Sequence, residues 1–182
     1  MRAKDIPNLL CVLRMLLTIP VAWAILEGWF RLALLLFLVA GFTDGLDGFL
    51  AKRYAWQSRL GGLLDPAADK LLLASAFVTL WVVGHVPGWL LTAVIGRDLI
   101  IIAGALLYYR RVGPFEAEPT IISKLNSGLQ LLYILLTLCL LVFAVPGPEF
   151  LSSLAWIVLA TTAVSGLDYV IRWSARASAA RS

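Results

Sequence analysis

Long apolar runs, separated by short breaks of polar and turn-forming residues, dominate this chain of 182 residues. Each of six runs is close to the roughly 20 residues that a helix needs to cross a bilayer. They are Leu9–Leu26, Leu32–Ala51, Leu63–Val83, Gly88–Tyr109, Ile122–Val145 and Phe150–Ile171. Glycine and proline mark most of the breaks. The runs lack the alternation of barrel strands, so the pattern predicts six transmembrane helices.

The composition supports this prediction, because 61% of the residues are hydrophobic and only 14% are charged. A soluble domain has roughly half apolar and a quarter charged residues. We therefore expect an all-α integral membrane protein, with a single domain over residues 1–182. The first run resembles a signal peptide, but its length and the charge of Arg14 inside it favour a retained first span.

The positions of lysine and arginine predict the topology, because these residues accumulate in cytoplasmic segments. Both termini and the second and fourth connections carry several of them. The first connection has only Arg31, and the third and fifth have none. We therefore expect both termini, and the connections after the second and fourth spans, to be cytoplasmic. In a bacterium this would be the cytoplasmic face of the inner membrane.

Four aspartates gather at the predicted cytoplasmic ends of the second and third spans. Asp44 and Asp47 are three residues apart, and Asp65 and Asp69 are four apart, so each pair shares one helix face. Asp65 before Pro66 also fits a helix N-cap, which is a structural alternative for that pair. Asp44 and Asp47 have no such explanation, because a helix C-terminus disfavours negative charge.

A bound divalent cation would supply the positive charge that four neighbouring carboxylates need. Ligand sets made only of oxygen atoms favour Mg²⁺ or Mn²⁺ over zinc, and four acids can hold two ions. Gly48 and Gly61 lie beside the two pairs, where glycine permits the close approach of a ligand or of a neighbouring helix.

The spacing of these residues resembles the signature of the CDP-alcohol phosphatidyltransferases. The chain reads Asp44-x-x-Asp47-Gly48-x-x-Ala51-Lys52, then eight residues, then Gly61-x-x-x-Asp65-x-x-x-Asp69. The family usually has arginine where this chain has Lys52, and lysine keeps the charge but loses the bidentate fork. The resemblance extends over most of the chain.

This resemblance implies an enzyme that transfers a phosphatidyl group from CDP-diacylglycerol to an alcohol and releases CMP. It implies two divalent ions bound by Asp44, Asp47, Asp65 and Asp69, with Asp69 also the catalytic base. The cytidine half would lie along Gly48, Ala51, Lys52 and Gly61. The resemblance also implies a homodimer, and we expect no nucleic-acid partner.

Three basic residues are candidates for binding a phosphate on the acceptor alcohol: Arg97, Arg110 and Lys124. Arg97 lies about ten residues into the fourth predicted span, where a buried arginine is a functional hypothesis. The alternatives are a structural ion pair of Arg97 with Asp98 or Asp168, and a Lys124 that reaches the interface.

Two acceptors fit a phosphate-binding pocket. The segment LDPAADK resembles phosphatidylglycerophosphate synthases, whose acceptor is glycerol 3-phosphate. The segment PTIISKLNSGLQL resembles cardiolipin synthases, whose acceptor is phosphatidylglycerol. We expect glycerol 3-phosphate, with phosphatidylglycerol as the alternative. A membrane cation transporter is the rival from another class, although transporter sites usually lie near the midplane between repeats.

Overall fold

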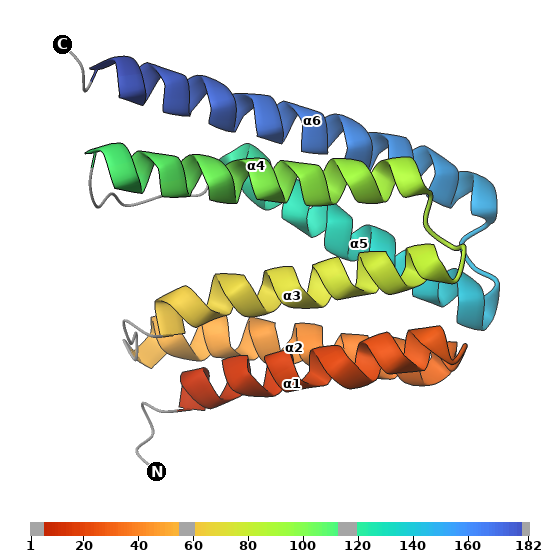
Figure 1. Ribbon diagram of the computed structural model, residues 1–182. Coiled ribbons are helices and arrows are strands. Elements are labelled where there is room, and N and C mark those ends of the chain that lie inside the picture. Colours follow the sequence, from red (N-terminus) through yellow and green to blue (C-terminus); the bar gives the residue numbers. More distant parts are fainter. Residues whose placement is uncertain (1–5, 55–60, 113–119, 180–182) are drawn as a thin grey trace. The chain divides into compact units, whose positions relative to one another are not determined.

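The computed structural model describes the backbone of residues 6–54, 61–112 and 120–179, and side chains within 11–43, 68–106, 110 and 120–172. These segments form helices joined by short connections (Figure 1). The helices are α1 (Ile6–Leu26), α2 (Phe30–Tyr54), α3 (Gly61–Val82), α4 (Gly88–Val112), α5 (Ile121–Phe143) and α6 (Pro148–Ala179). The described part of the chain contains no strand, so the all-α prediction is confirmed.

Each predicted apolar run coincides with one helix, and the largest difference is at the end of α6. That helix continues to Ala179, although the apolar run ends at Ile171. Among the described residues, three segments are long and apolar enough to cross a membrane: Gly88–Leu106, Ile121–Phe143 and Pro148–Arg172. Two more apolar segments, Cys11–Leu26 and Phe30–Thr43, are shorter. Six spans with cytoplasmic termini therefore remain a prediction.

The helices fall into two compact units, which we describe separately. Unit 1 comprises Met1–Val86 and Ile134–Gly147, and unit 2 comprises Pro87–Tyr133 and Pro148–Ser182. The helix α5 contributes residues to both units. A single domain over residues 1–182 stays a prediction.

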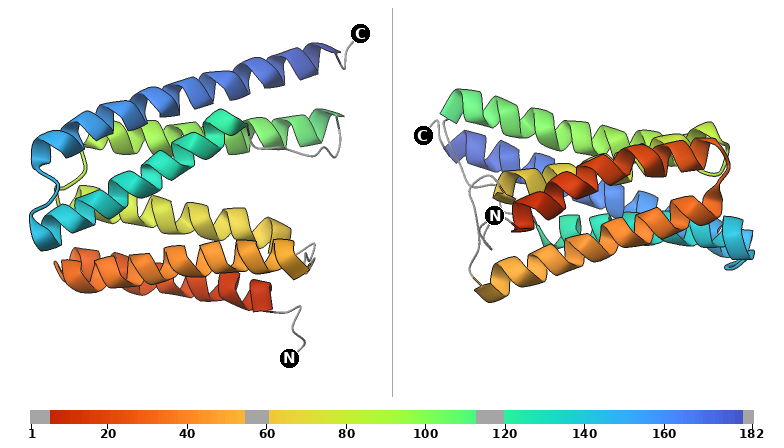
Figure 2. Two further views of the ribbon diagram at one scale, coloured as in Figure 1. Left: turned by 180° about the vertical axis from the view of Figure 1, so that it is seen from behind. Right: turned by 90° about the horizontal axis from the view of Figure 1, so that it is seen from below.

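In unit 1, α1 packs against both α2 and α3 (Figure 2). Alanines with no exposed surface, among them Ala24, Ala33 and Ala76, lie in this core and permit close approach of the helices. Larger buried side chains fill the remaining space: Val21, Ile25, Phe37, Phe77 and Leu80. The result is a packing of α1 against α2 and α3, the two helices that carry the aspartate motif.

In unit 2, α4 packs against α6. Trp89, near the start of α4, stacks on Trp156 of α6, with ring centroids 4.8 Å apart and ring planes 21° apart. Further along the pair, an added Cβ at Gly166 would meet the Arg97 side chain at 3.7 Å. This is an ordinary van der Waals distance, so the Arg97 side chain passes close to Gly166 between the two helices.

Glycine ends two helices in the same way. After α1, Gly28 has a φ of 73°, its N–H donates to the Ile25 carbonyl, and the Trp29 N–H donates to the Ala24 carbonyl. After α3, Gly84 has a φ of 82°, and the N–H groups of Gly84 and His85 make the equivalent bonds. Both are Schellman motifs, which glycine favours because it has no Cβ to clash at positive φ.

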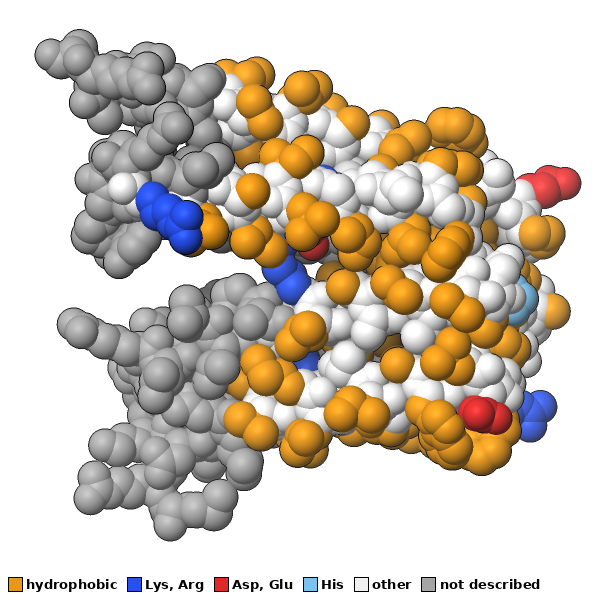
Figure 3. Space-filling model, in the orientation of Figure 1, with side chains coloured by type: hydrophobic (Ala, Val, Ile, Leu, Met, Phe, Trp, Pro, Cys, Tyr) orange, Lys and Arg blue, Asp and Glu red, His pale blue; other side chains and the backbone are white. Residues whose placement is uncertain are grey.

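Large hydrophobic side chains cover the outer surface of the helices. Phe42 and Ile19 are each 70% exposed, and Figure 3 shows similar orange side chains over the visible face of both units. Water-soluble monomers rarely expose apolar surface on this scale. Together with the three long apolar helices, the surface identifies a protein suited to a lipid environment.

Many hydroxyl side chains bond to their own helix. Thr18, Thr43, Thr79 and Thr92 each donate to a backbone carbonyl three or four residues earlier, at 2.8–3.2 Å. Ser75 and Ser153 do the same in α3 and α6. These bonds satisfy the hydroxyl donors without a partner from another helix.

The core of unit 1 makes a stability prediction. Phe77 has no exposed surface, so we expect Phe77→Ala to lower the free energy of unfolding in detergent by about 3–5 kcal/mol, because it leaves a cavity. Phe42→Ala is the matched control, since Phe42 is 70% exposed, and its effect should stay within about 0.5 kcal/mol. Equal losses for the two variants would contradict the core assignment.

Candidate active site

The predicted donor-site residues lie where α2 ends and α3 begins, at the same end of unit 1 (Figures 1 and 2). The last part of α2 carries Asp44, Asp47, Gly48, Ala51 and Lys52, and the first part of α3 carries Gly61, Asp65 and Asp69. The described side chains include Asp69 but not the other seven, so the remaining contacts of the predicted set lie outside the described residues.

The start of α3 tests the structural alternative for Asp65. The helix begins at Gly61, four residues before Asp65. An N-cap residue precedes the first helical residue, and boundary assignments differ by only one or two positions. Asp65 is therefore inside α3 and does not cap it, which removes the capping explanation for this carboxylate.

Arg14 of α1 forms an ion pair with Asp69 of α3. The Arg14 side chain has no exposed surface, and its Nη1 donates to the Asp69 Oδ1 at 2.5 Å. The Asp69 side chain is 46% exposed, so the carboxylate is anchored on one side and accessible on the other. The ion pair thus gives this carboxylate a defined position at the start of α3.

The donor set of the motif fits hard divalent cations. Two pairs of carboxylates, each pair on one helix face, supply only oxygen atoms, which suit Mg²⁺ or Mn²⁺. The anchored and accessible Asp69 is compatible with such a role. Among the described side chains no group of three or more His, Cys, Asp or Glu could hold a metal, and that set excludes Asp44, Asp47 and Asp65. The metal site stays a prediction.

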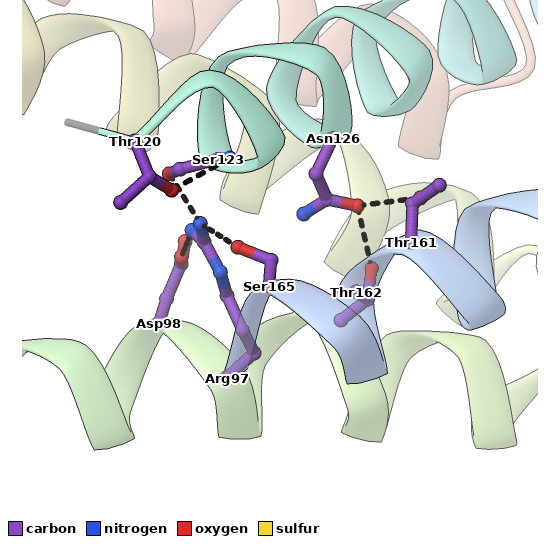
Figure 4. A network of polar contacts seen from close by, with 8 residues as sticks. All are labelled: Arg97, Asp98, Thr120, Ser123, Asn126, Thr161, Thr162 and Ser165. Atoms are coloured by element: carbon purple, nitrogen blue, oxygen red, sulfur yellow. Dashed lines mark hydrogen bonds and ion pairs between the residues drawn. The ribbon is translucent and has the colours of Figure 1, made fainter. Parts of the chain in front are cut away.

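Arg97 of α4 ties three helices together in unit 2 (Figure 4). Its Nη2 donates to the Ser123 hydroxyl of α5 at 2.5 Å and to the Ser165 hydroxyl of α6 at 2.7 Å. Its Nη1 donates to the Asp98 Oδ1 at 2.7 Å, and the guanidinium carbon lies 5.8 Å from the centre of the Tyr169 ring. Arg97 is only 5% exposed. It thus lies in a buried, hydroxyl-rich polar site.

The sequence offered two ion-pair partners for Arg97, and the structure contains one of these two pairs. Arg97 pairs with Asp98, whereas Asp168 accepts a bond from the Arg172 Nε at 2.8 Å. The ion pair with Asp98 does not use every hydrogen-bond donor of Arg97, because its buried Nε has no hydrogen-bond partner in the described part of the protein. A guanidinium beside two serine hydroxyls also has the chemistry to bind a phosphate.

The other two predicted acceptor residues are exposed. Lys124 follows Ser123 directly, but Ser123 is buried and Lys124 is not, so the two side chains leave α5 in different directions. Arg110 lies thirteen residues after Arg97 in α4, which corresponds to about 20 Å along the helix axis. The basic pocket formed by these three residues stays a prediction.

A row of buried polar side chains on α5 was not assigned from the sequence. Ser123, Asn126 and Gln130 follow one another at spacings of three and four residues, and all three are buried. Thr161 and Thr162 of α6 both donate to the Asn126 Oδ1 at 2.9 Å. The signal was visible in the sequence, because three polar residues at helical spacing interrupt an otherwise apolar span.

The nitrogen ends of two amides in this row lack partners among the residues that the structure describes. Among the described contacts, neither the Asn126 Nδ2 nor the Gln130 Nε2 has a hydrogen-bond partner, although Asn126 is 0% and Gln130 3% exposed. An unpaired buried donor costs about 1–3 kcal/mol. Buried polar groups are usually satisfied, so these two donors call for an explanation.

Comparison with known proteins identifies the class to which this helical, lipid-suited chain belongs. The model of the family described as CDP-alcohol phosphatidyltransferase matches residues 4–167. The match takes in most of the chain and both halves of the aspartate motif. The chain therefore belongs to the CDP-alcohol phosphatidyltransferase family.

Individual relatives carry two different names. A Drosophila melanogaster protein named probable cardiolipin synthase (CMP-forming) is 36% identical over 182 residues, which cover 91% of this chain and 56% of that protein. The Homo sapiens cardiolipin synthase (CMP-forming) is 34% identical, covering 90% of this chain and 60% of the human protein. An Aquifex aeolicus CDP-diacylglycerol–glycerol-3-phosphate 3-phosphatidyltransferase is 31% identical, covering 92% and 95% of the two chains.

The ties of Arg97 can be tested through a serine. We expect Ser165→Ala to lower the free energy of unfolding by about 1.5–3 kcal/mol, because it removes a buried hydrogen bond to a charged group. Ser153→Ala on the same helix is the matched control, since the described bond of the exposed Ser153 hydroxyl stays within α6, and its effect should stay within about 0.5 kcal/mol. Indistinguishable effects would contradict a stabilising role for this contact.

Proposed function

We propose that this protein transfers a phosphatidyl group from CDP-diacylglycerol to an alcohol that carries a phosphate, with release of CMP. The observation that carries the proposal is the complete aspartate motif on α2 and α3, two helices that both pack against α1, with Asp69 held by the buried Arg14. Membership of the family supports the same activity. The reaction would serve the synthesis of anionic phospholipids.

In the proposed reaction, the acceptor hydroxyl attacks the phosphorus of the phosphatidyl group. The bond from this phosphorus to the oxygen that bridges to CMP breaks, CMP leaves, and Asp69 accepts the hydroxyl proton. Divalent ions held by Asp44, Asp47, Asp65 and Asp69 would neutralise the pyrophosphate charge. Gly48, Ala51, Lys52 and Gly61 would line the cytidine half of the donor.

Arg14 has a positioning role in this proposal. Its guanidinium holds one oxygen of Asp69, which fixes the direction of the carboxylate. The Asp69 side chain is 46% exposed, so in this proposal the acceptor hydroxyl reaches the carboxylate from its accessible side. A base held in place in this way needs little rearrangement when the proton moves.

For the acceptor we propose phosphatidylglycerol, which would make the chain a cardiolipin synthase. The relatives named cardiolipin synthase are 34–36% identical to this chain, against 31% for the Aquifex glycerol-3-phosphate enzyme. Glycerol 3-phosphate, which the sequence favoured, is the second candidate, because that enzyme aligns over 95% of its own length. In either case we propose that Arg97 binds the acceptor phosphate; Arg110 and Lys124 stay candidates from the sequence alone, since Arg110 lies about 20 Å from Arg97 along α4 and Lys124 leaves α5 in another direction from Ser123.

The proposed site lies at the cytoplasmic face, where a lipid-linked diphosphate and its acceptor can both arrive. The distribution of lysine and arginine supports this placement, because it predicts a cytoplasmic connection between α2 and α3. We keep the homodimer as part of the proposal, on the strength of the family resemblance.

The base assignment predicts a large loss of activity. Purified Asp69→Asn should release CMP from CDP-diacylglycerol at least about 100-fold more slowly than the wild type, because amide nitrogen and oxygen cannot accept the proton. Asp168→Asn is the matched control: Asp168 also pairs with an arginine, lies outside the matched residues 4–167, and should keep near-normal activity.

The melting temperature of both variants checks that they fold. Normal CMP release by folded Asp69→Asn would overturn the proposed activity. If instead the protein were a cation transporter, the wild type in liposomes would take up cations, release no CMP, and lose uptake in Asp69→Asn.

The acceptor can be assigned by parallel assays with Mg²⁺ or Mn²⁺. With CDP-diacylglycerol and phosphatidylglycerol we expect cardiolipin and CMP as products, identified by mass spectrometry of the lipid and by CMP release. Phosphatidylglycerophosphate, formed only when glycerol 3-phosphate is supplied, would reverse the order of the two acceptors and leave the proposed reaction type unchanged.

A further inference from the structure

Asn126 and Gln130 of α5 each have a side-chain N–H donor without a partner among the described contacts. Asn126 and Gln130 are four residues apart, so they lie on one face of the helix, one turn apart. Both are at least nine-tenths buried, and the nitrogen end of each lacks a partner among the described contacts. In a helix long and apolar enough to cross a membrane, donors of this kind are costly to keep.

The orientation of Asn126 is set by its neighbours. Thr161 and Thr162 both donate to its oxygen, so its nitrogen is turned away from α6. In Figure 4 the nitrogen lies on the side of the amide that faces Arg97. The bonds to α6 thus hold a donor toward the polar site built by Arg97, Ser123 and Ser165.

The chemistry of these donors selects their ligand. Amide N–H groups carry no net charge, so they bind neutral oxygens such as hydroxyls and ester carbonyls without the strong attraction that an arginine gives a phosphate. Gln130 lies seven residues beyond Ser123, about 10 Å further along the helix axis. A ligand that contacts both Ser123 and Gln130 must extend into the apolar part of α5. A diacyl lipid extends that far, whereas a small soluble phosphate does not.

We propose that Asn126 and Gln130 bind uncharged oxygens of a lipid acceptor, its glycerol hydroxyls or its ester carbonyls, next to the phosphate site at Arg97. This inference rests on the proposed phosphatidyl transfer to a phosphate-bearing acceptor, and it adds a subsite that recognises the lipid part. The two amides are specificity residues that contact substrate, and their unpaired donors are satisfied when the acceptor is bound.

Gln130→Leu tests the proposal, because leucine has a similar volume and removes a buried unpaired donor. We expect the KM for phosphatidylglycerol to rise about tenfold, the KM for CDP-diacylglycerol to stay within about twofold, and the melting temperature to hold or increase; tenfold corresponds to about 1.4 kcal/mol. The half-buried Ser127→Ala on the same helix is the control and should change none of these values.

A second variant covers the case in which Gln130→Leu does not fold. Asn126→Asp keeps the oxygen that accepts from the threonines and replaces the donor nitrogen by oxygen, so it should also raise the KM for phosphatidylglycerol selectively. A KM increase for glycerol 3-phosphate as well assigns the glycerol hydroxyls, and an increase for phosphatidylglycerol alone assigns the ester carbonyls. Unchanged acceptor KM values in both folded variants overturn the proposal.

A binding readout separates this inference from the proposed function. In detergent, phosphatidylglycerol should raise the melting temperature of the wild type more than the same mole fraction of phosphatidylcholine does, and Gln130→Leu should lose that difference. If the wild type released no CMP with either acceptor, the proposed function would fail, and this shift alone would decide the subsite. An equal shift in wild type and Gln130→Leu would overturn the subsite.

Discussion

A charge inside an apolar helix must find its partner within the protein, because lipid offers none. Two buried arginines meet this constraint. Arg14 reaches from α1 to Asp69 of α3, and Arg97 reaches from α4 to serines on α5 and α6 while it pairs with Asp98. Arg14 thus joins two helices of unit 1, and Arg97 joins three helices of unit 2.

Both polar sites keep features that the ion pairs alone do not account for. Asp69 remains about half exposed although Arg14 holds it, and Arg97 keeps a buried Nε without a described partner. Folding alone would favour apolar replacements for such groups, since an isolated buried ion pair is weak support for stability. Their persistence in the interior is what a binding or catalytic role would require, at some loss of stability.

The helices and the aspartate pairs were readable from the sequence, but the contacts between helices were not. Hydropathy located all six helices, and Gly28 and Gly84 marked two of their ends. It placed the end of α6 too early, because it measures how apolar a segment is and not how far the helix continues. The spacing of Asp65 and Pro66 suggested a cap, whereas α3 begins at Gly61. Ser123 and Ser165 were not predicted as partners of Arg97. Their role depends on which turns of three helices are neighbours, and the periodicity of a single sequence does not give this information.

The hydroxyls that bond within their own helices have a consequence for how lipid meets this protein. A hydropathy scale counts every threonine and serine as polar, yet a hydroxyl bonded to a carbonyl of the preceding turn, as at Thr18, Thr43 or Thr92, offers little unmet hydrogen bonding to its surroundings. To an acyl chain such a residue is close in shape and character to a valine or an alanine. The surface that a bilayer would contact is thus more apolar than the number of serine and threonine residues in the sequence suggests.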